Sequence, residues 1–197
     1  MKKLILFLLF FSVNFFVFSQ SADDSEIKTI RFKEDGNGYI QFYTNDPAYS
    51  ASLVTDSSPE ENTNTNGFEM EIKTMSGSEN VGGGMVFGAE DDYNWYAVFI
   101  SPNGYFEIVR CKDLRIGTLK GGNTRQIIRG LGKTNSIKVI QKKGQYKIYL
   151  NNKIFPLYTI KDIDIEGNKI GHCVNLGGSF RLFPEGYVDI RYKIKEA

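Results

Sequence analysis

The stretch Gly82–Arg110, GGGMVFGAEDDYNWYAVFISPNGYFEIVR, contains three short runs of apolar, β-branched and aromatic residues. The runs are Gly84–Gly88, Trp95–Ser101 and Tyr105–Arg110. An acidic turn, Ala89–Asp92, separates the first two runs, and Pro102–Gly104 separates the last two. Turn-forming residues between runs of this composition are typical of β-strands. The stretch therefore predicts three strands in succession.

Outside this stretch, the chain continues to alternate apolar runs with turns. Further strands are expected at Ile27–Glu34, Gly38–Thr44, Ala48–Val54, Gly67–Thr74, Ser136–Gln141, Tyr146–Leu150, Lys153–Leu157, Asn168–Leu176 and Tyr187–Lys195. Gly67–Thr74 is the clearest, because Phe68, Met70 and Ile72 share one face and charged residues occupy the other. No segment has a convincing helical pattern. Strands of this length and spacing predict a two-sheet β-sandwich.

The first residues match a signal peptide. Lys2 and Lys3 precede the apolar run Leu4–Phe18, and small residues at Val17 and Ser19 suit a signal peptidase. We predict residues 1–19 as the signal peptide and residues 20–197 as a single domain. The run is short for a membrane span, so no integral span is expected after cleavage; an uncleaved anchor is the alternative. The sequence thus predicts export from a bacterial cell, to the periplasm, the cell surface or the medium.

Charge excludes one class of partner. Removing the signal peptide takes two lysines from 24 basic residues and leaves 22 against 23 acidic ones, a net charge of −1. Bulk charge therefore gives no reason to expect nucleic acid. The one basic cluster lies in Cys111–Lys133, which five glycines interrupt and which we expect to be irregular. It would attract an anionic partner such as an acidic glycan or a phospholipid headgroup, although a solvated loop is the simpler interpretation.

Several pieces of the sequence follow one another in a recognisable order. They are Gly84–Phe87, Asp91–Asp92, Asn94–Tyr96, Gly104–Tyr105, Asn135–Val139, Ile148–Asn151 and Gly167–Gly171. This order resembles the concanavalin A-like lectin/glucanase superfamily, in its laminin-G-like and 3-keto-disaccharide-hydrolase-type branches, over about Gly67–Lys193. The resemblance implies an all-β fold, a two-sheet antiparallel jelly-roll β-sandwich. It also implies binding of a glycan or another extracytoplasmic ligand.

A candidate ligand site lies in the central stretch. Tyr93, Trp95 and Tyr105 lie at or beside turns, where a flat aromatic face can stack against the C–H face of a sugar ring. Asn94 and Arg110 would supply hydrogen bonds to the hydroxyl groups of the sugar. These five residues are the predicted ligand-binding site. Burial of the aromatic rings in the core is the alternative, and it is common in β-sandwiches.

The acidic turn is a candidate calcium site. Asp91 and Asp92, with Glu90, would supply carboxylate oxygens, and backbone carbonyls would complete the six or more ligands that calcium takes. Laminin-G-like domains often hold calcium on a rim loop, so the resemblance implies such a site here. The spacing matches no fixed calcium motif. Two cysteines and one histidine are too few for zinc.

The cysteines and the histidine have structural interpretations. Cys111 and Cys173 would be able to pair in an oxidising compartment, but two separate thiols are the favoured interpretation. His172 alternates in register with Ile170 and Val174, which predicts a hydrogen-bonded side chain in or along the core.

A carboxylate motif occurs late in the chain. Asp162–Glu166 reads DIDIE and resembles the E-x-D-x-E signature of a glucanase family with the same fold. On a strand, that spacing puts all three carboxylates on one face, where two of them act in retaining hydrolysis. Asp162 replaces the first glutamate, and the segment falls in a predicted connector. An acidic connector is therefore favoured over a catalytic site.

We predict an exported, non-catalytic binding module whose partner is a glycan or an envelope protein. A glycoside-active hydrolase of the same fold is one alternative, and it requires two carboxylates about 5–9 Å apart. Glu69 and Glu71 share a face and would be half of such a pair, although a wet outer face explains them more simply. A protein–protein interaction module is the other alternative, and it predicts an exposed apolar patch around Phe99.

Overall fold

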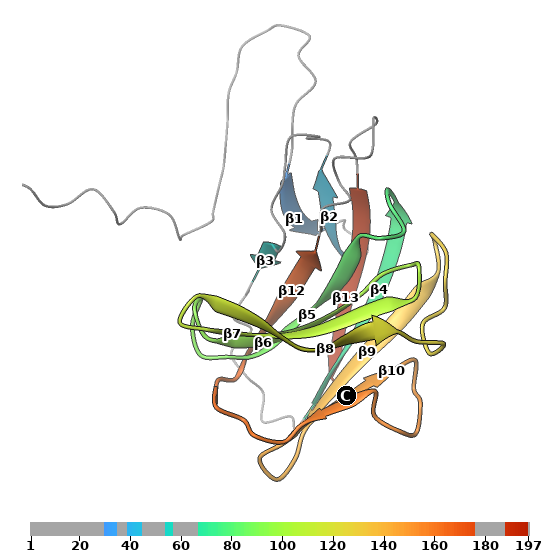
Figure 1. The fold of residues 1–197 in the computed structure, drawn as a ribbon. Coiled ribbons are helices and arrows are strands. Elements are labelled where there is room, and N and C mark those ends of the chain that lie inside the picture. The colour runs from blue at the N-terminus through green and yellow to red at the C-terminus, as the bar shows by residue number, and fades with distance from the viewer. Residues whose placement is uncertain (1–29, 35–38, 45–53, 57–66, 176–187, 197) are drawn as a thin grey trace, which may run out of the picture.

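The computed structural model describes residues 30–34, 39–44, 54–56, 67–175 and 188–196. The predicted signal peptide, residues 1–19, lies outside the described residues. Within these ranges every regular element is a strand, and the strands form two antiparallel sheets (Figure 1). No helix in the described ranges is long and apolar enough to cross a membrane.

The two sheets contain the following strands. The seven-stranded sheet has the order β1 (Ile30–Glu34), β2 (Ile40–Thr44), β13 (Val188–Glu196), β4 (Gly67–Ser76), β9 (Thr134–Gln141), β10 (Tyr146–Leu150) and β11 (Tyr158–Ile160). The six-stranded sheet has the order β3 (Val54–Asp56), β12 (Lys169–Asn175), β5 (Gly82–Ala89), β6 (Trp95–Ile100), β7 (Tyr105–Lys112) and β8 (Arg115–Asn123). The three strands predicted from Gly82–Arg110 are β5, β6 and β7, which pair in succession.

The main core lies between the two sheets. In β6, Tyr96, Val98 and Ile100 point inward and are at most 3% exposed. Met70 and Ile72 of β4 belong to the same buried cluster, on the face that the sequence predicted. Each apolar side chain removed from water contributes roughly 1.5–3 kcal/mol to stability. Alternation along the strands thus confirms the predicted sandwich.

The outer face of the six-stranded sheet is buried as well. Trp95 and Phe99 of β6 lie in a second apolar cluster with Val86, Ala89, Ala97, Val109, Cys111 and Cys173. A Cβ on Gly82 would come within 2.9 Å of the Phe99 ring, so glycine makes room for that ring. Because Phe99 is only 3% exposed, it offers no exposed apolar patch to a partner protein.

Cys111 and Cys173 are free and buried, as the favoured interpretation expected. His172 is 2% exposed, as its register predicted. Glu69 lies in register with Lys138 and Lys195 of the neighbouring strands, and Glu71 with Lys193. Both glutamates are half-buried, which fits the simpler interpretation of a wet outer face.

The structure differs from the prediction at β8, which lies inside the segment Cys111–Lys133 that was expected to be irregular. β8 pairs with β7 from Tyr105↔Asn123 to Lys112↔Arg115, with a register shift between Ile108 and Val109. Backbone pairing needs no apolar side chains, and β8 is the last strand of its sheet and largely exposed. The glycines that suggested a loop therefore belong to an edge strand.

A smaller difference concerns the strand predicted at Lys153–Leu157. This segment is a loop, and β11 begins at Tyr158, which pairs with Ile148. Pro156 has no N–H group and restricts the residue before it. Regular pairing with β10 therefore starts only after the proline, where the Leu157 N–H donates to the Ile148 carbonyl at 2.7 Å.

Candidate functional site

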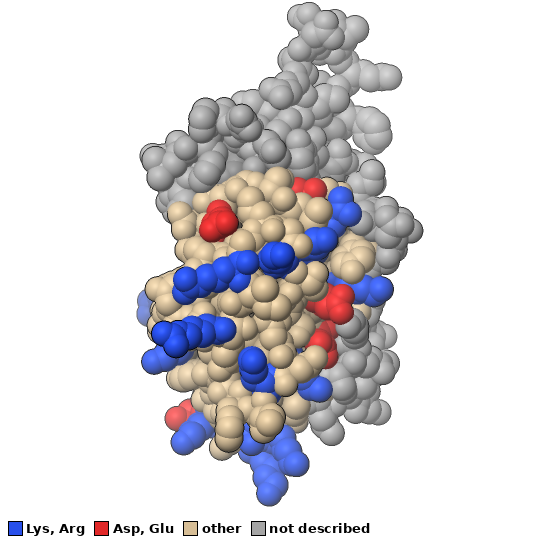
Figure 2. Space-filling view, turned by 90° about the vertical axis from the view of Figure 1, so that its right-hand side faces the viewer, with Lys and Arg blue, Asp and Glu red and all other residues tan. Residues whose placement is uncertain are grey.

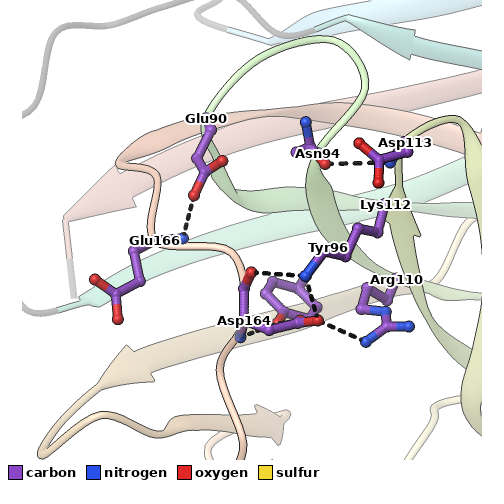
Figure 3. Close-up of polar contacts among 8 residues, drawn as sticks. All are labelled: Glu90, Asn94, Tyr96, Arg110, Lys112, Asp113, Asp164 and Glu166. Carbon is purple, nitrogen blue, oxygen red and sulfur yellow. Dashed lines mark hydrogen bonds and ion pairs between the residues drawn. The ribbon is translucent and has the colours of Figure 1, made fainter.

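Three segments meet at one end of the six-stranded sheet. They are the β5–β6 turn around Glu90–Asn94, the β7–β8 turn at Asp113–Leu114, and residues 161–168, which cross from β11 in one sheet to β12 in the other. Polar side chains of these segments and of the adjoining ends of β6 and β7 form a group that we call the turn cluster: Glu90, Asn94, Tyr96, Arg110, Lys112, Asp113, Asp164 and Glu166 (Figure 3).

Asp164 lies at the centre of the turn cluster (Figure 3). Tyr96 donates its hydroxyl to Oδ1 at 2.8 Å, and Arg110 donates Nη1 to Oδ2 at 2.8 Å. Lys112 donates Nζ to the same Oδ2 at 2.9 Å. The pKa of Asp164 is lowered, first by the hydrogen bond from Lys112 and then by the hydrogen bond from Tyr96 and the charge of Arg110. The carboxylate is therefore ionised at neutral pH.

The side chains of the crossing segment alternate between the core and water. Ile163 packs against the main core and Ile165 is 1% exposed, while Asp162, Asp164 and Glu166 lie on the wet side. The Glu166 N–H donates to Glu90 Oε1 at 2.7 Å. The DIDIE motif thus lies on irregular backbone rather than on a strand, in agreement with the acidic connector that the sequence favoured.

The β5–β6 turn is held by its own side chains. Asp91 Oδ1 accepts the Tyr93 N–H at 2.8 Å, and Asn94 Nδ2 donates to the same carboxylate at 3.0 and 3.1 Å. These bonds, with that of Tyr93 first, lower the pKa of Asp91. Asn94 Oδ1 accepts the Asp113 N–H of the β7–β8 turn at 3.2 Å. Asn94 therefore fastens the two turns together.

Aromatic rings form the floor beneath the cluster. Phe87 lies 5.9 Å from Tyr96 and 5.1 Å from Tyr146 between ring centroids. Burial, with smaller contributions from Tyr96 and Glu166, raises the pKa of Tyr146 to about 12. Gly88 has a positive φ of 60°, and a Cβ there would lie 2.5 Å from the Tyr146 hydroxyl oxygen. The glycine leaves the space that this ring occupies.

The structure brings together three of the five predicted ligand-binding residues. Tyr93, which is 41% exposed, and Asn94 lie in the β5–β6 turn, and Arg110 lies in the turn cluster. Trp95 is adjacent but only 6% exposed, with Nε1 donating to the Asp92 carbonyl at 3.1 Å, so its ring face is not available for stacking. Tyr105 lies at the opposite end of the β6–β7 hairpin, where it pairs with Asn123.

The predicted calcium ligands have other contacts. Both carboxylate oxygens of Asp91 accept hydrogen bonds from within the turn, whereas the Asp92 side chain is exposed. Among the described residues, no group of three or more His, Cys, Asp or Glu is arranged to hold a metal ion. Calcium at Asp91 and Asp92 stays a prediction.

Sequence reasoning missed Lys112, Tyr96 and the role of Asp164. Lys112 follows Arg110 by two residues, so alternation along a strand puts both cations on one side. Asp164 was noticed only as part of an acidic motif. Its partners Tyr96 and Arg110 lie 68 and 54 residues away in sequence. No local signal links residues at that separation.

No protein-family model matches the chain, and no curated protein matches it. Solved structures do match. The carbohydrate-binding module CBM66 from Bacillus subtilis aligns with a TM-score of 0.50 and 12% identity over 80% of each chain. A beta-1,3-glucanase from Mycobacterium marinum aligns with a TM-score of 0.50 and 11% identity, over 82% of this chain and 76% of that one.

A third match, the GH43 protein BlXynB from Bacillus licheniformis, aligns with a TM-score of 0.50 and 12% identity over 81% of this chain, which spans only 33% of that protein. At such low identities these similarities show the fold alone. The fold is a jelly-roll β-sandwich, as the sequence resemblance implied.

Proposed function

We propose that this chain is an exported, non-catalytic module that binds a glycan at the turn cluster. The observation that carries the proposal is the exposed Tyr93 on a turn that is fastened to a charged hydrogen-bonding group. The Arg110, Lys112 and Asp164 side chains are 41%, 42% and 34% exposed, so a ligand is able to reach them. A sugar needs this combination of an aromatic face with donors and acceptors.

The hydrogen-bonding capacity of the cluster supports this function. Arg110 reaches Asp164 through Nη1, and a guanidinium carries five N–H donors in a fixed plane. Further donors therefore remain for sugar hydroxyls. Asn94 bonds to Asp91 and Asp113, so that the turn that carries Tyr93 is held in place before a ligand arrives. A preorganised site loses less entropy on binding.

The charge state of Asp164 argues against this carboxyl group as the general acid of a glycoside hydrolase. A glycoside hydrolase keeps one carboxyl group protonated to act as the general acid. The pKa of Asp164 moves in the opposite direction, because Lys112, Tyr96 and Arg110 stabilise the carboxylate. Similarity in fold to a carbohydrate-binding module and to a glucanase is compatible with either activity, so it does not decide between them.

The proposal is tested by screening the protein on a glycan array and titrating the best ligand by calorimetry. Tyr93→Ala and Arg110→Ala are each expected to weaken binding about tenfold, the loss of roughly one good contact. Tyr105→Ala is the matched control, because it removes a tyrosine at the far end of the same hairpin. Binding to no glycan, or equal losses in Tyr93→Ala and Tyr105→Ala, would contradict the site.

Two additions to this experiment address the alternatives. Release of new reducing ends from a bound glycan, abolished by Asp164→Asn, would establish a hydrolase instead. Repeating the titration with a chelator tests calcium. If Asp91 and Asp92 hold the ion, chelation and Asp92→Asn should weaken glycan binding to the same extent, and chelation should have no further effect on the variant.

A further inference from the structure

The chain from Leu114 to Lys161 contains no Asp or Glu. It contains eleven basic residues: Arg115, Lys120, Arg125, Arg129, Lys133, Lys138, Lys142, Lys143, Lys147, Lys153 and Lys161. This stretch forms β8, the last strand of one sheet, and β9, β10 and β11, the last three strands of the other. Lys and Arg side chains are spread over the described surface on the side toward which β8 ends, between larger areas of uncharged residues and beside a few Asp and Glu (Figure 2).

Two loops of this stretch form one surface, which we call the two-loop platform. It consists of residues 124–133 between β8 and β9 and residues 151–157 between β10 and β11. Asn151 Nδ2 donates to the Gln126 carbonyl and to Asn135 Oδ1, both at 2.7 Å. Asn135, which is 6% exposed, exchanges two hydrogen bonds with the backbone of Ile128, at 2.7 and 3.0 Å. These bonds hold the two loops in a fixed relation.

The platform exposes large apolar side chains. Ile154 is 88% exposed and its neighbour Phe155 is 78% exposed, in the β10–β11 loop. Ile128 and Leu131 of the other loop are 51% and 38% exposed. Two adjacent apolar residues that extend this far into water are uncommon unless they contact a partner.

The same platform carries only positive charge. Arg125, Arg129, Lys133 and Lys153 are exposed, and neither loop contains an acidic residue. Apolar side chains at a loop tip with basic residues around them match the two layers of an anionic lipid surface. Cations interact with the headgroups, and apolar groups enter the region just below the headgroups.

We propose that the two-loop platform docks this protein on an anionic lipid surface. Ile154 and Phe155 enter the headgroup region, and the four basic residues interact with the lipid phosphates. An anionic polysaccharide would satisfy the basic residues but would leave Ile154 and Phe155 in water. A lipid surface satisfies both. The platform and the turn cluster are built from different loops, so a docked molecule is able to bind a glycan as well.

The test uses vesicles of equal parts phosphatidylglycerol and phosphatidylcholine, with vesicles of phosphatidylcholine alone for comparison. The protein is purified in the form that the cell produces, and every variant carries the same N-terminus. Cosedimentation should show binding to the anionic vesicles only. Ile154→Ser with Phe155→Ser should reduce this binding more than tenfold. Arg125→Gln and Lys153→Gln should each reduce it about fivefold, the effect expected of one basic residue near an anionic membrane.

Lys142→Gln with Lys143→Gln is the matched control. These lysines lie in the β9–β10 turn, at the opposite end of β10 from the platform, roughly 17 Å away for a five-residue strand. The double variant loses two charges from the same acid-free stretch. If attraction is spread over the whole stretch, this variant should bind as weakly as the platform variants. If the platform docks, it should bind like the unmodified protein.

Fluorescence adds a direct measure of insertion. Trp95 is the only tryptophan and is buried, so a Phe155→Trp variant introduces one exposed reporter over a constant background. Its emission should shift to the blue on anionic vesicles and be quenched by brominated lipid. Equal binding to neutral vesicles, no quenching, or binding that survives Ile154→Ser with Phe155→Ser would overturn the proposal. Binding to soluble dextran sulfate without vesicle binding would assign the platform to a polyanion instead.

Discussion

His172 is the residue whose burial has the clearest consequence for stability. Its ring lies 5.3 Å from the Tyr192 ring at 67°, inside the sandwich. Burial lowers the pKa of His172 from 6.5 to about 4. The unfolded chain therefore takes up a proton near pH 6.5, while the folded chain resists protonation until about pH 4. Stability present at neutral pH is lost as the pH falls through this window.

We expect the free energy of unfolding to fall by roughly 3 kcal/mol from this one group between neutral pH and about pH 4. The His172→Gln variant should lack that part of the pH dependence, whatever its stability at neutral pH. Urea unfolding at a series of pH values measures both slopes. Parallel slopes for the two proteins would show that His172 is protonated equally in the folded and unfolded states.

Asp164 gives a second prediction at the residue scale. Asp164→Asn keeps an acceptor for Tyr96 but removes the charge that pairs with Arg110 and Lys112. Since these ion pairs are partly exposed and screened by water, the free energy of unfolding of the variant should be about 0.5–1 kcal/mol lower at neutral pH. The pKa of Asp164 is lower in the folded protein than in the unfolded chain, where it is about 3.9. The stabilisation is therefore fully present above the pKa of the unfolded chain, and it is lost as the pH falls through the pKa of the folded protein.

Asp162→Asn is the control for this prediction, because Asp162 lies exposed on the same crossing segment. Thermal unfolding at neutral pH should separate Asp164→Asn from both Asp162→Asn and the unmodified protein. At acidic pH the three proteins should converge. A difference that persists after Asp164 is protonated would mean that packing, rather than charge, is responsible.

At the residue scale, the sequence predicted which residues lie at the site better than it predicted which side chains they contact. Tyr93, Asn94 and Arg110 were identified from local chemistry, and the structure places the first two on the β5–β6 turn and Arg110 near the end of β7. Trp95 was predicted with the same logic but faces the outer cluster. A strand that is apolar on both faces does not reveal which aromatic rings are covered, because the cover comes from elsewhere in the chain.

At the scale of the elements, the two loops of the platform depend on one side chain. Asn151 makes hydrogen bonds to the Gln126 carbonyl and Asn135, and its Oδ1 accepts the Ser136 N–H at 2.8 Å. Asn151→Ala should therefore lower the free energy of unfolding by about 2 kcal/mol, because several buried partners lose their hydrogen bonds. Urea unfolding measures the loss.

Asn152→Ala provides a matched control. Both asparagines have positive φ, 49° for Asn151 and 55° for Asn152, so alanine introduces similar backbone strain at either position. Asn152 is exposed. The difference between the two variants therefore isolates the hydrogen bonds. Equal destabilisation would mean that backbone conformation alone accounts for the effect.

Central strands of the two sheets were predictable from the sequence, whereas β8 and β11, at the ends of the two sheets, were not. β5, β6 and β7 have apolar runs between turn-forming residues, and β4 has a strict alternation, so each follows from its own sequence. Among the described strands, β8 and β11 are the end strands of their sheets, where backbone pairing with one neighbour is sufficient. β8 contains three glycines among its nine residues, and β11 is only three residues long and follows the loop that contains Pro156. No local pattern therefore distinguishes either strand from a loop.

At the scale of the whole molecule, the two cysteines report on global opening. Cys111 and Cys173 lie in the same buried cluster on different strands, and burial raises the pKa of both thiols. A thiolate is the reactive form. Both residues should therefore react with iodoacetamide far more slowly in the native protein than in urea. The two labelling rates should also fall together as the free energy of unfolding rises.

Mass spectrometry of the labelled protein tests this expectation. Two labels after denaturation without reductant would show that both thiols are free in the purified protein. Fast native labelling of one cysteine alone would indicate local opening around that strand. A mass lower by two hydrogens with no labelling would show that the pair oxidises in its compartment, despite being separate in this structure.

The overall architecture and a basic cluster in Cys111–Lys133 followed from the sequence, but the way in which folding groups the charges of Leu114–Lys161 did not. A net charge near zero says nothing about where basic residues gather, because acidic residues elsewhere balance the stretch from Leu114 to Lys161. Folding places the strands of that stretch at the ends of both sheets. Only the order of strands in the two sheets reveals that its charges share one side.

β8 also affects how copies of this protein behave at high concentration. Among the described strands it ends its sheet, and the unpaired groups along such an edge are a template for another chain to extend the sheet. Arg115 and Lys120 put like charges on that edge, and Gly117, Gly121 and Gly122 make it a poor strand to copy. Two molecules that meet there repel each other, and polymer growth from this edge is blocked at its first step.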